Sequence, residues 1–569
     1  MLTTVAALFT LASCKEDDKT PVFADPTITV TPSTASQLPG GKVTFSIAIT
    51  AEAGAASVKL NDTEIKSYAT ETKADAFSYE YTVPAGATSG DLNFTVTDKQ
   101  TTAKTATAKS TLTVGTPGKE TVIVDAAITS NTTWSANKFY LLKGNIYVQA
   151  SAELTIEPGT IVLGDKVTKG ALIVSRGAKI HAKGTSAAPI IFTSSAPKGF
   201  RNYGDWGGVV ILGNEANNQS VNQTIEGISA ATGDNGKYGG TSTTDDSGEF
   251  YYVRIEFGGI ALSTDNELNG LTLGSVGKES EIHHIQVSYS GDDSFEWFGG
   301  TVNHEYLVAY RGFDDDLDVD FGYSGNVQYA AVFRDPNFAD KSGSNAFESD
   351  NDGSGSTNTP KTSAKFANVT WFGPHVYSKP RTGSSPGFAA SIDKDAASDN
   401  YQFGGHIRRK TDIQIYNSAF VGSQLEGVHF DGTGSAAEFK GNYFGRTGIS
   451  TSTAGTVKKE TAPLNTAQLA TFDADNFSTT SGATQTGAFD LSAVFAGMKY
   501  NQGTDNKWSN NLSIDTPGGL LASGSTLLTG AKTVPSGLTQ KDYVGAFDAT
   551  NNWMAGWTEF NPINKDYGN

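Results

Sequence analysis

Two segments in the middle of the chain repeat each other about twenty residues apart. Residues 291–299 read Gly-Asp-Asp-Ser-Phe-Glu-Trp-Phe-Gly, and residues 312–322 again place Gly and Phe around an Asp-rich turn. A weaker echo lies at 422–432. Repetition at a short period is typical of a solenoid, in which each repeat packs only on its neighbours. The repeat therefore favours a stack of similar coils over a globular layered fold.

Apolar triplets extend this pattern toward the N-terminus. They recur at about the same interval in residues 154–156, 172–174 and 190–192, with no helical pattern between them. Residues 184–193 and 205–211 resemble the rung signatures of right-handed parallel β-helix proteins of the pectin-lyase-like kind. This resemblance implies a right-handed parallel β-helix over residues 119–569, with a decorated and capped C-terminal part.

Residues 25–116 show a different pattern. Short segments such as 27–30, 43–47 and 79–83 alternate apolar and polar side chains and are bounded by Gly, Pro, Asn or Asp. Alternation with a period of two predicts half-buried strands, here about seven in a β-sandwich. The segment resembles the cysteine-free immunoglobulin-like modules of bacterial surface proteins. The fold class expected for the whole chain is all-β.

The N-terminus carries a lipobox. Residues 11–14 read Leu-Ala-Ser-Cys after the apolar run 5–11, and Cys14 is the only cysteine. We expect residues 1–14 to be a lipoprotein signal peptide, Cys14 to accept the lipid and residues 15–24 to form a tether. The acidic residues 16–18 resemble the export signal of Bacteroidota surface lipoproteins. An ordinary buried cysteine is the alternative.

These features predict a bacterial outer-membrane lipoprotein that faces outward and touches the membrane only through its lipid. No apolar stretch after Cys14 approaches the ~20 residues that span a bilayer. The formal net charge of −18 excludes nucleic acid and anionic lipid surfaces as partners, because their phosphates would be repelled. Cations, above all calcium, remain compatible with this charge.

Carboxylates recur in the repeated segments. Stacked coils place equivalent positions roughly 4.8 Å apart, so we expect Glu296 to lie over Asp318, and Asp293 over one of residues 314–316. Such a column repels itself unless a cation intervenes, and calcium prefers oxygen ligands. Turn-forming side chains and catalytic carboxylates are the alternatives. The candidate metal ligands are Asp292, Asp293, Glu296, Asp314, Asp315, Asp316, Asp318 and Asp320.

Zinc is not expected, because the chain shows no cysteine or paired-histidine spacing for it. His283 and His284 should point to opposite faces of a strand. The acidic segment 349–355 lacks the glutamate that an EF-hand needs twelve positions on, so we interpret it as a solvated loop. Residues 404–410 resemble the His and Arg-x-Lys elements of polygalacturonases. Those elements lie on separate rungs in that family, so we interpret the match as coincidental.

Aromatic residues interspersed with polar ones suit sugar recognition, because ring faces stack on the apolar faces of sugars. The candidate ligand-binding residues are Trp297, Tyr310, Trp371 and His375. Residues 371–375 contain Gly and Pro and are expected to form an exposed loop.

Three functions fit these observations. The favoured one is capture of a glycan or other extracellular nutrient, beside an outer-membrane uptake receptor. The alternative is a calcium-dependent polysaccharide lyase or glycoside hydrolase, for which Arg311, Asp293 and Asp315 are candidate catalytic residues and Arg334 is a second candidate base. An adhesin or structural stalk is the third, because fold alone does not decide function.

Overall fold

The protein consists of two units, residues 1–118 and 119–569. The computed structural model describes residues 22–114, 118–228, 233–263, 266–335, 338–340, 342–376, 400–423, 427–431, 436–445, 457–459, 475–478, 494–496, 514 and 517–569. Cys14 and most of the expected tether lie outside these residues. No helix within them is long and apolar enough to cross a membrane.

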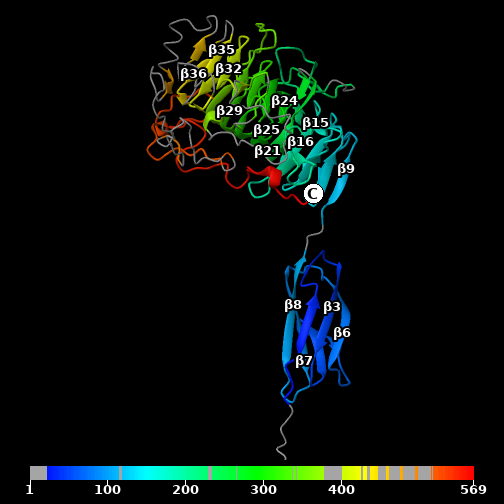
Figure 1. Ribbon diagram of the computed structural model, residues 1–569. Coiled ribbons are helices and arrows are strands. Elements are labelled where there is room, and N and C mark those ends of the chain that lie inside the picture. The colour runs from blue at the N-terminus through cyan, green and yellow to red at the C-terminus, as the bar shows by residue number, and fades with distance from the viewer. Residues whose placement is uncertain are drawn as a thin grey trace, which may run out of the picture. The chain divides into compact units, whose positions relative to one another are not determined.

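The N-terminal unit is built from two β-sheets around one core (Figure 1). Its strands are β1 (Thr27–Thr31), β2 (Thr34–Gln37), β3 (Lys42–Thr50), β4 (Ala55–Leu60), β5 (Thr63–Ser67), β6 (Ala74–Thr82), β7 (Gly90–Asp98) and β8 (Thr105–Val114). One sheet has the order β1-β3-β6 and the other β2-β8-β7-β4-β5. Strand β3 alternates strictly between exposed and buried residues, as expected for a sheet with one wet face. That this unit is immunoglobulin-like remains a prediction.

The second unit stacks short strands into two long parallel sheets. Its strands in chain order are β9 (Glu120–Val124), β10 (Thr132–Trp134), β11 (Lys138–Leu142), β12 (Asn145–Val148), β13 (Glu153–Ile156), β14 (Ile161–Gly164), β15 (Ala171–Val174), β16 (Lys179–Lys183), β17 (Ile190–Ser194), β18 (Gly208–Leu212), β19 (Gln223–Thr224), β20 (Lys237–Tyr238), β21 (Gly248–Glu256), β22 (Ile260–Ser263), β23 (Asn266–Leu268), β24 (Leu271–Val276), β25 (Glu281–Ser288), β26 (Phe295–Gly300), β27 (His304–Tyr310) and β28 (Leu317–Asp320). They continue with β29 (Asn326–Phe333), β30 (Phe347–Ser349), β31 (Lys365–Phe372), β32 (Gly405–Arg408), β33 (Gln414–Tyr416), β34 (Ala419–Val421), β35 (Val428–Asp431), β36 (Glu438–Lys440), β37 (Tyr443–Gly445), β38 (Val457–Lys459) and β39 (Phe477–Ser478), with short 3-10 helices η1 (Pro374–Val376), η5 (Thr526–Leu528) and η6 (Pro562–Asn564).

Apart from two antiparallel pairs, β19–β20 and β22–β23, these strands form a parallel β-helix with three faces. The ten-stranded sheet runs β12-β15-β18-β24-β26-β28-β30-β32-β35-β38 and makes one face. The larger sheet makes the other two faces, and from β21 to β31 each strand bends between them at a residue with positive φ, for example Tyr252 in β21 and Tyr306 in β27. The all-β class and the parallel β-helix expected from the sequence are thus confirmed.

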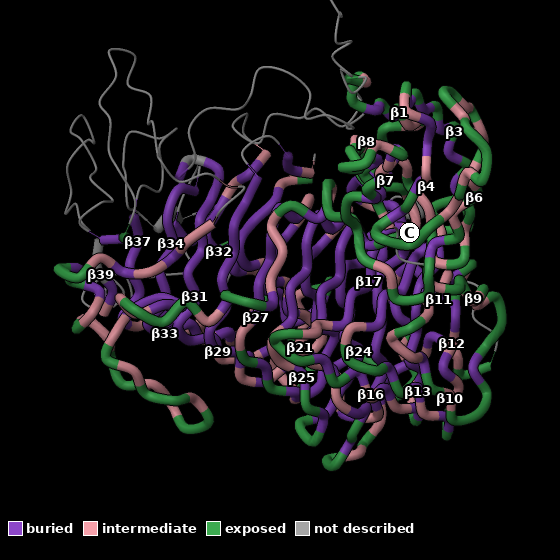
Figure 2. Tube along the Cα trace, turned by 90° about the horizontal axis from the view of Figure 1, so that it is seen from below, coloured by how far each residue is buried: buried purple, intermediate pink, exposed green. Residues whose placement is uncertain are grey.

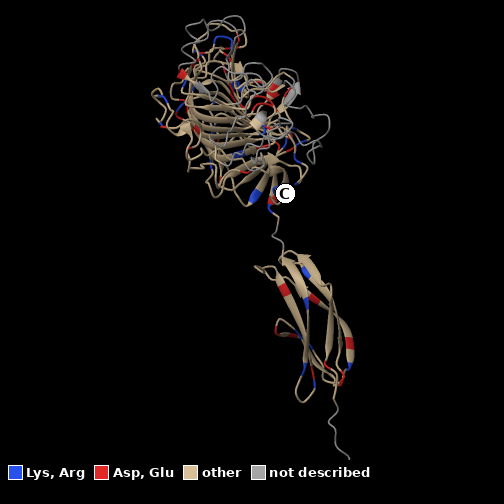
Figure 3. Ribbon diagram, turned by 60° about the vertical axis from the view of Figure 1, so that its left-hand side comes forward, with Lys and Arg blue, Asp and Glu red and all other residues tan. Residues whose placement is uncertain are grey.

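Apolar side chains fill the inside of the stack. Phe295, Trp297, Leu317, Val319 and Phe347 of the ten-stranded sheet all belong to one continuous buried core. Figure 2 shows the stacked strands as long runs of buried residues. In Figure 3 the same strands are mostly tan, the colour of residues other than Lys, Arg, Asp and Glu. Because side chains alternate along a strand, the residues between these apolar ones face outward.

A C-terminal strap, residues 517–569, runs back along the β-helix (Figure 1). The side-chain amide of Asn417 donates to the carbonyl of Lys532, Trp553 packs edge-on against Tyr306, and Arg201 donates to the carbonyl of Pro562. The strap therefore links the late rungs to the early ones.

Candidate functional site

The outer face of the ten-stranded sheet carries two columns of polar side chains. In the first column, Glu296 pairs in register with Asp318, Asp318 with Glu348, Glu348 with His406, and His406 with His429. The predicted stacking of Glu296 on Asp318 is confirmed. The column begins with carboxylates and ends with two imidazoles, one rung after another.

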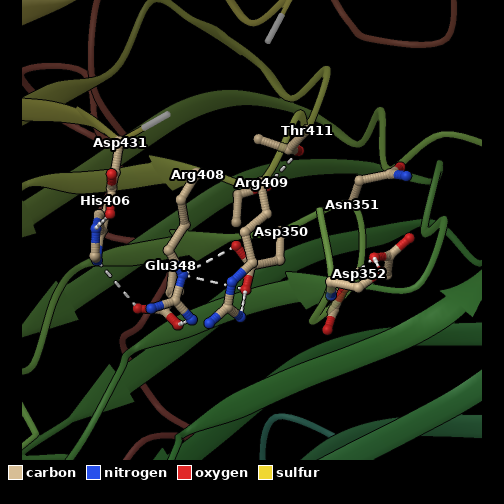
Figure 4. Close-up of polar contacts among 12 residues, drawn as sticks. Glu348, Asp350, Asn351, Asp352, His406, Arg408, Arg409, Thr411 and Asp431 are labelled. Atoms are coloured by element: carbon tan, nitrogen blue, oxygen red, sulfur yellow. Dashed lines mark hydrogen bonds and ion pairs between the residues drawn. The ribbon is translucent and has the colours of Figure 1, made fainter. Parts of the chain in front are cut away.

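The second column lies two residues along each strand. It contains Asp320, Asp350, Arg408 and Asp431, with Arg409 beside it. The Arg408 Nε donates to Asp350 Oδ1 at 2.9 Å, and the Arg409 Nη1 contacts Asp350 Oδ2 at 2.6 Å (Figure 4). The Arg409 side chain is 42% exposed and that of Asp431 is 55% exposed. Both signs of charge therefore reach solvent, at Arg409 directly after β32 and at Asp431 in β35.

Glu348 lies at the centre of this arrangement. It forms an ion pair with Arg408, and its Oε2 lies 3.3 Å from the Nδ1 of His406. Burial raises the pKa of Glu348, but the hydrogen bond from His406 and the charge of Arg408 outweigh it, so the pKa is lowered. Glu348 therefore stays ionised and bridges the two columns.

Glu296 and Asp318 of the first column form a group of three close carboxylates with Asp293, which lies just before β26. One oxygen each of Asp293, Glu296 and Asp318 lies within 4.8 Å of the other two. Burial first, and neighbouring carboxylates second, raise the pKa of all three. The Oδ1 of Asp318 is buried and accepts no hydrogen bond from any described residue. This oxygen-rich group fits a hard cation such as calcium.

A second group shares one member with the first. One oxygen each of Asp292, Asp293 and Asp314 lies within 4.8 Å of the others. Burial raises the pKa of Asp314 to about 7, and its Oδ1 is buried without a hydrogen-bond partner among the described residues. The two groups together offer five of the eight predicted metal ligands. Asp315, Asp316 and Asp320 belong to neither group.

Asp293 and Asp315 also form a ladder that holds adjacent rungs together. The amide of Asp293 donates to Asn269, the amide of Asp315 donates to Asp293 Oδ1 at 2.8 Å, and the amide of Asn345 donates to Asp315. The turn-forming alternative is thus partly right, although each side chain accepts from the next rung rather than from its own turn. Asp315 is 5% exposed and one of its oxygens is committed to this backbone bond, so the structure does not support a catalytic role for it.

The two candidate arginine bases are sealed inside the protein. Arg311 is 7% exposed, forms an ion pair with Asp335 and donates from Nε to the hydroxyl of Tyr310. Arg334 is fully buried and contacts Asp316. A guanidinium sealed in this way cannot reach a substrate, so the structure does not support the expectation for Arg311.

The predicted sugar-binding aromatics are core residues. Trp297, Tyr310 and Trp371 are all fully buried. Trp297 donates from Nε1 to His304 Nε2 at 2.9 Å, and Tyr310 donates its hydroxyl to carbonyls of the C-terminal part. The expected exposure of Trp371 is wrong, because it lies on the inward side of β31. The side chain of His375 lies outside the described part of the structure.

Two polar segments also differ from expectation. Residues 349–355 are solvated only at Gly353 and Ser354: Asp350 and Asn351 are buried, and Asp352 accepts from the amides of Ser354 and Ser356. These bonds outweigh burial and lower the pKa of Asp352 to about 2. Residues 404–410, which sequence reasoning set aside, supply the imidazole and both guanidiniums of the site.

The side chains of His283 and His284 also differ from the expected arrangement. The Nδ1 atoms of His283 and His284 lie 2.7 Å apart instead of on opposite faces of the strand. His284 has a φ of +52°, which interrupts the two-residue alternation at the bend of the larger sheet.

A family model described as a pectate-lyase-like β-helix domain matches residues 126–493, well over half of the chain. No curated protein and no solved structure matches the chain.

Proposed function

The chain belongs to the family of pectate-lyase-like β-helix domains, and we propose that this domain binds an extracellular polysaccharide on the outer face of its ten-stranded sheet. The observation that supports this most is the mixed-charge network of Glu348, Asp350, Arg408, Arg409 and Asp431, of which Arg409 and Asp431 reach solvent. Carboxylates accept hydrogen bonds from sugar hydroxyls, and guanidiniums donate to sugar oxygens or carboxylates. Parallel strands repeat these groups along the stack, which suits a ligand that is itself a repeating chain.

Calcium is part of the proposal. The carboxylates of Asp293, Glu296 and Asp318 would hold it, and the unpartnered Oδ1 of Asp318 supports this assignment. A bound Ca²⁺ would neutralise the repulsion of the buried carboxylates. It could also attract an acidic sugar to the same face.

The proposed location is the outer face of a bacterial outer membrane, with lipid on Cys14 and an outer-membrane uptake receptor as partner. The lipobox at 11–14 supports this proposal. Cys14→Ala should move the protein from the membrane fraction to the soluble fraction of expressing cells. Retention of this variant in the membrane would refute lipid anchoring.

Binding is tested by affinity electrophoresis against a panel of neutral and uronate-containing polysaccharides, with calcium or with EDTA. Arg409→Ala should weaken binding at least tenfold, because its exposed guanidinium lies beside Asp350. Lys183→Ala is the matched control, since Lys183 is also exposed and paired with a carboxylate but lies on the larger sheet. If the polysaccharide retards both variants equally, or if no polysaccharide retards the parent protein, the proposal is overturned and the structural-stalk alternative is favoured.

A calcium-dependent lyase or hydrolase is the second candidate, and the carboxylate group at Asp293 favours it. With Arg311 and Arg334 sealed, Arg409 is the base we would assign to a lyase. Release of reducing ends, or of products with the ultraviolet absorbance of unsaturated uronates, would establish catalysis. Binding without either product would leave a non-catalytic glycan-binding protein.

A further inference from the structure

Two histidines that are 23 positions apart in the chain lie side by side in the fold. Strands β32 and β35 pair in parallel, with His406 opposite His429 and Arg408 opposite Asp431. The two imidazole rings lie with their centroids 5.3 Å apart on the outer face of the sheet. One rung of the β-helix therefore produces a histidine pair that no local motif contains.

Asp431 completes a group of three possible ligands. Its Oδ2 lies 3.8 Å from the Nε2 of His406, and one ligand atom of each of His406, His429 and Asp431 lies within 4.8 Å of the others. The chemistry differs from that of the carboxylate groups farther up the column, because two of the three ligands are imidazole nitrogens. Imidazole suits zinc, cobalt, nickel and copper, whereas calcium prefers oxygen.

The surroundings hold both rings in place. Glu348 Oε2 lies 3.3 Å from His406 Nδ1, so a carboxylate holds this edge of the ring and Nε2 is turned toward Asp431 (Figure 4). A carboxylate behind a histidine in this way is the usual outer partner of a metal-binding imidazole. His429 is 5% exposed, and its ring stacks on Phe403 at a centroid distance of 4.3 Å. Little reorganisation is needed to bring the three ligands around one ion.

We propose that His406, His429 and Asp431 bind one divalent transition-metal ion of the zinc type. Because the Asp431 side chain is 55% exposed, solvent can reach the ion and supply a further ligand. Three protein ligands plus a solvent position is the arrangement of reactive zinc sites, whereas structural sites use four protein ligands. The site is separate from the proposed calcium group and does not depend on polysaccharide binding.

The test is a cobalt titration of the full chain carrying Cys14→Ala and no histidine tag. That substitution removes the only cysteine, so no thiolate can bind the probe. We expect one equivalent of Co²⁺ to produce the visible absorption of a four- or five-coordinate ion, and one equivalent of Zn²⁺ to abolish it. Excess Ca²⁺ should leave the signal unchanged.

Substitutions identify the ligands. Asp431→Asn and His406→Gln should each lower the affinity for Co²⁺ at least tenfold, and Glu348→Gln should lower it by about 10- to 100-fold through its hold on His406. Asp431 is exposed, so an unchanged unfolding temperature of Asp431→Asn shows that loss of binding is not loss of the fold. His181→Gln is the matched control, since His181 also lies beside carboxylates but on the larger sheet. Unchanged affinity in Asp431→Asn and His406→Gln, or no bound equivalent in the parent, would overturn the proposal.

Discussion

The carboxylate group of Asp293, Glu296 and Asp318 predicts that one substitution changes the stability of the protein in opposite directions without and with calcium. Asp318→Asn removes one charge and keeps the shape of the side chain. Without calcium, the substitution should stabilise the protein, because it relieves repulsion from two buried neighbours. With calcium, it should remove the stabilisation that the ion provides.

The size of this stability change follows from the distances between the carboxylates. Two unit charges 4.8 Å apart repel by about 3.5 kcal/mol at an effective dielectric constant of about 20. Burial and the neighbouring Glu348 raise the pKa of Asp318, so a bound proton relieves part of this repulsion, and we take about 3 kcal/mol as the repulsion that the substitution removes. Unfolding entropy of about 2.1 cal/mol/K per residue over roughly 450 residues converts 3 kcal/mol into about 3 °C. Calcium at one hundred times its Kd should stabilise the parent by about 2.7 kcal/mol, a similar shift.

Calorimetric melting of both proteins in EDTA and in calcium tests this reasoning. The variant should melt about 3 °C above the parent in EDTA and should gain nothing from calcium. Asp320→Asn is the matched control, because Asp320 is on the same strand and face but outside both carboxylate groups, and it should keep the calcium response. A variant that melts below the parent in EDTA, or that gains as much from calcium as the parent, would refute the assignment.

Three further predictions concern buried side chains. Trp557→Ala in the strap should destabilise the β-helix by about 3–5 kcal/mol, because the ring is 2% exposed. The melting temperature should fall, and an unchanged melting temperature would contradict the place of Trp557 in the core. His304 is buried and accepts the Nε1 proton of Trp297, and burial lowers its pKa to about 3. The unfolded chain therefore binds more protons below pH 6.5, and the parent should lose about 3 kcal/mol by pH 4 relative to His304→Gln; parallel stability curves would refute this. Arg311→Gln should cost about 3–5 kcal/mol in chemical denaturation, because it breaks the buried ion pair with Asp335. Loss of polysaccharide binding in a fully folded variant would instead restore a role for Arg311 at the ligand.

The sequence predicted those parts of the site that repeat at the spacing of one rung. Glu296 and Asp318 are 22 positions apart and stack as expected. The same rule, applied to His406 and His429, would have found the histidine pair. The pair is hard to see in the sequence because the strands on either side of β32 are separated from it by unequal stretches of chain, so the period is broken there.

Other errors have local physical causes. Once Glu296 faces outward, alternation along the strand requires Trp297 to face the core, so its burial could have been inferred. His284 could not be placed by this rule, since its positive φ turns the chain at a bend that the sequence does not mark. The partners of Arg311 and Asp350 come from other rungs, and pairing of that kind is visible only when the stack is assembled.

The strap makes the stability of an early rung depend on residues that are synthesised last. Arg201 belongs to an early rung and is 1% exposed, yet it donates to the carbonyls of Pro562 and Lys565, which are made some 361 residues later. Closing a loop of that length costs roughly 5 kcal/mol of chain entropy, and solenoid rungs otherwise depend only on their neighbours. A nascent chain that stops short leaves a buried guanidinium without these acceptors, so the fold itself distinguishes a finished molecule from a truncated one.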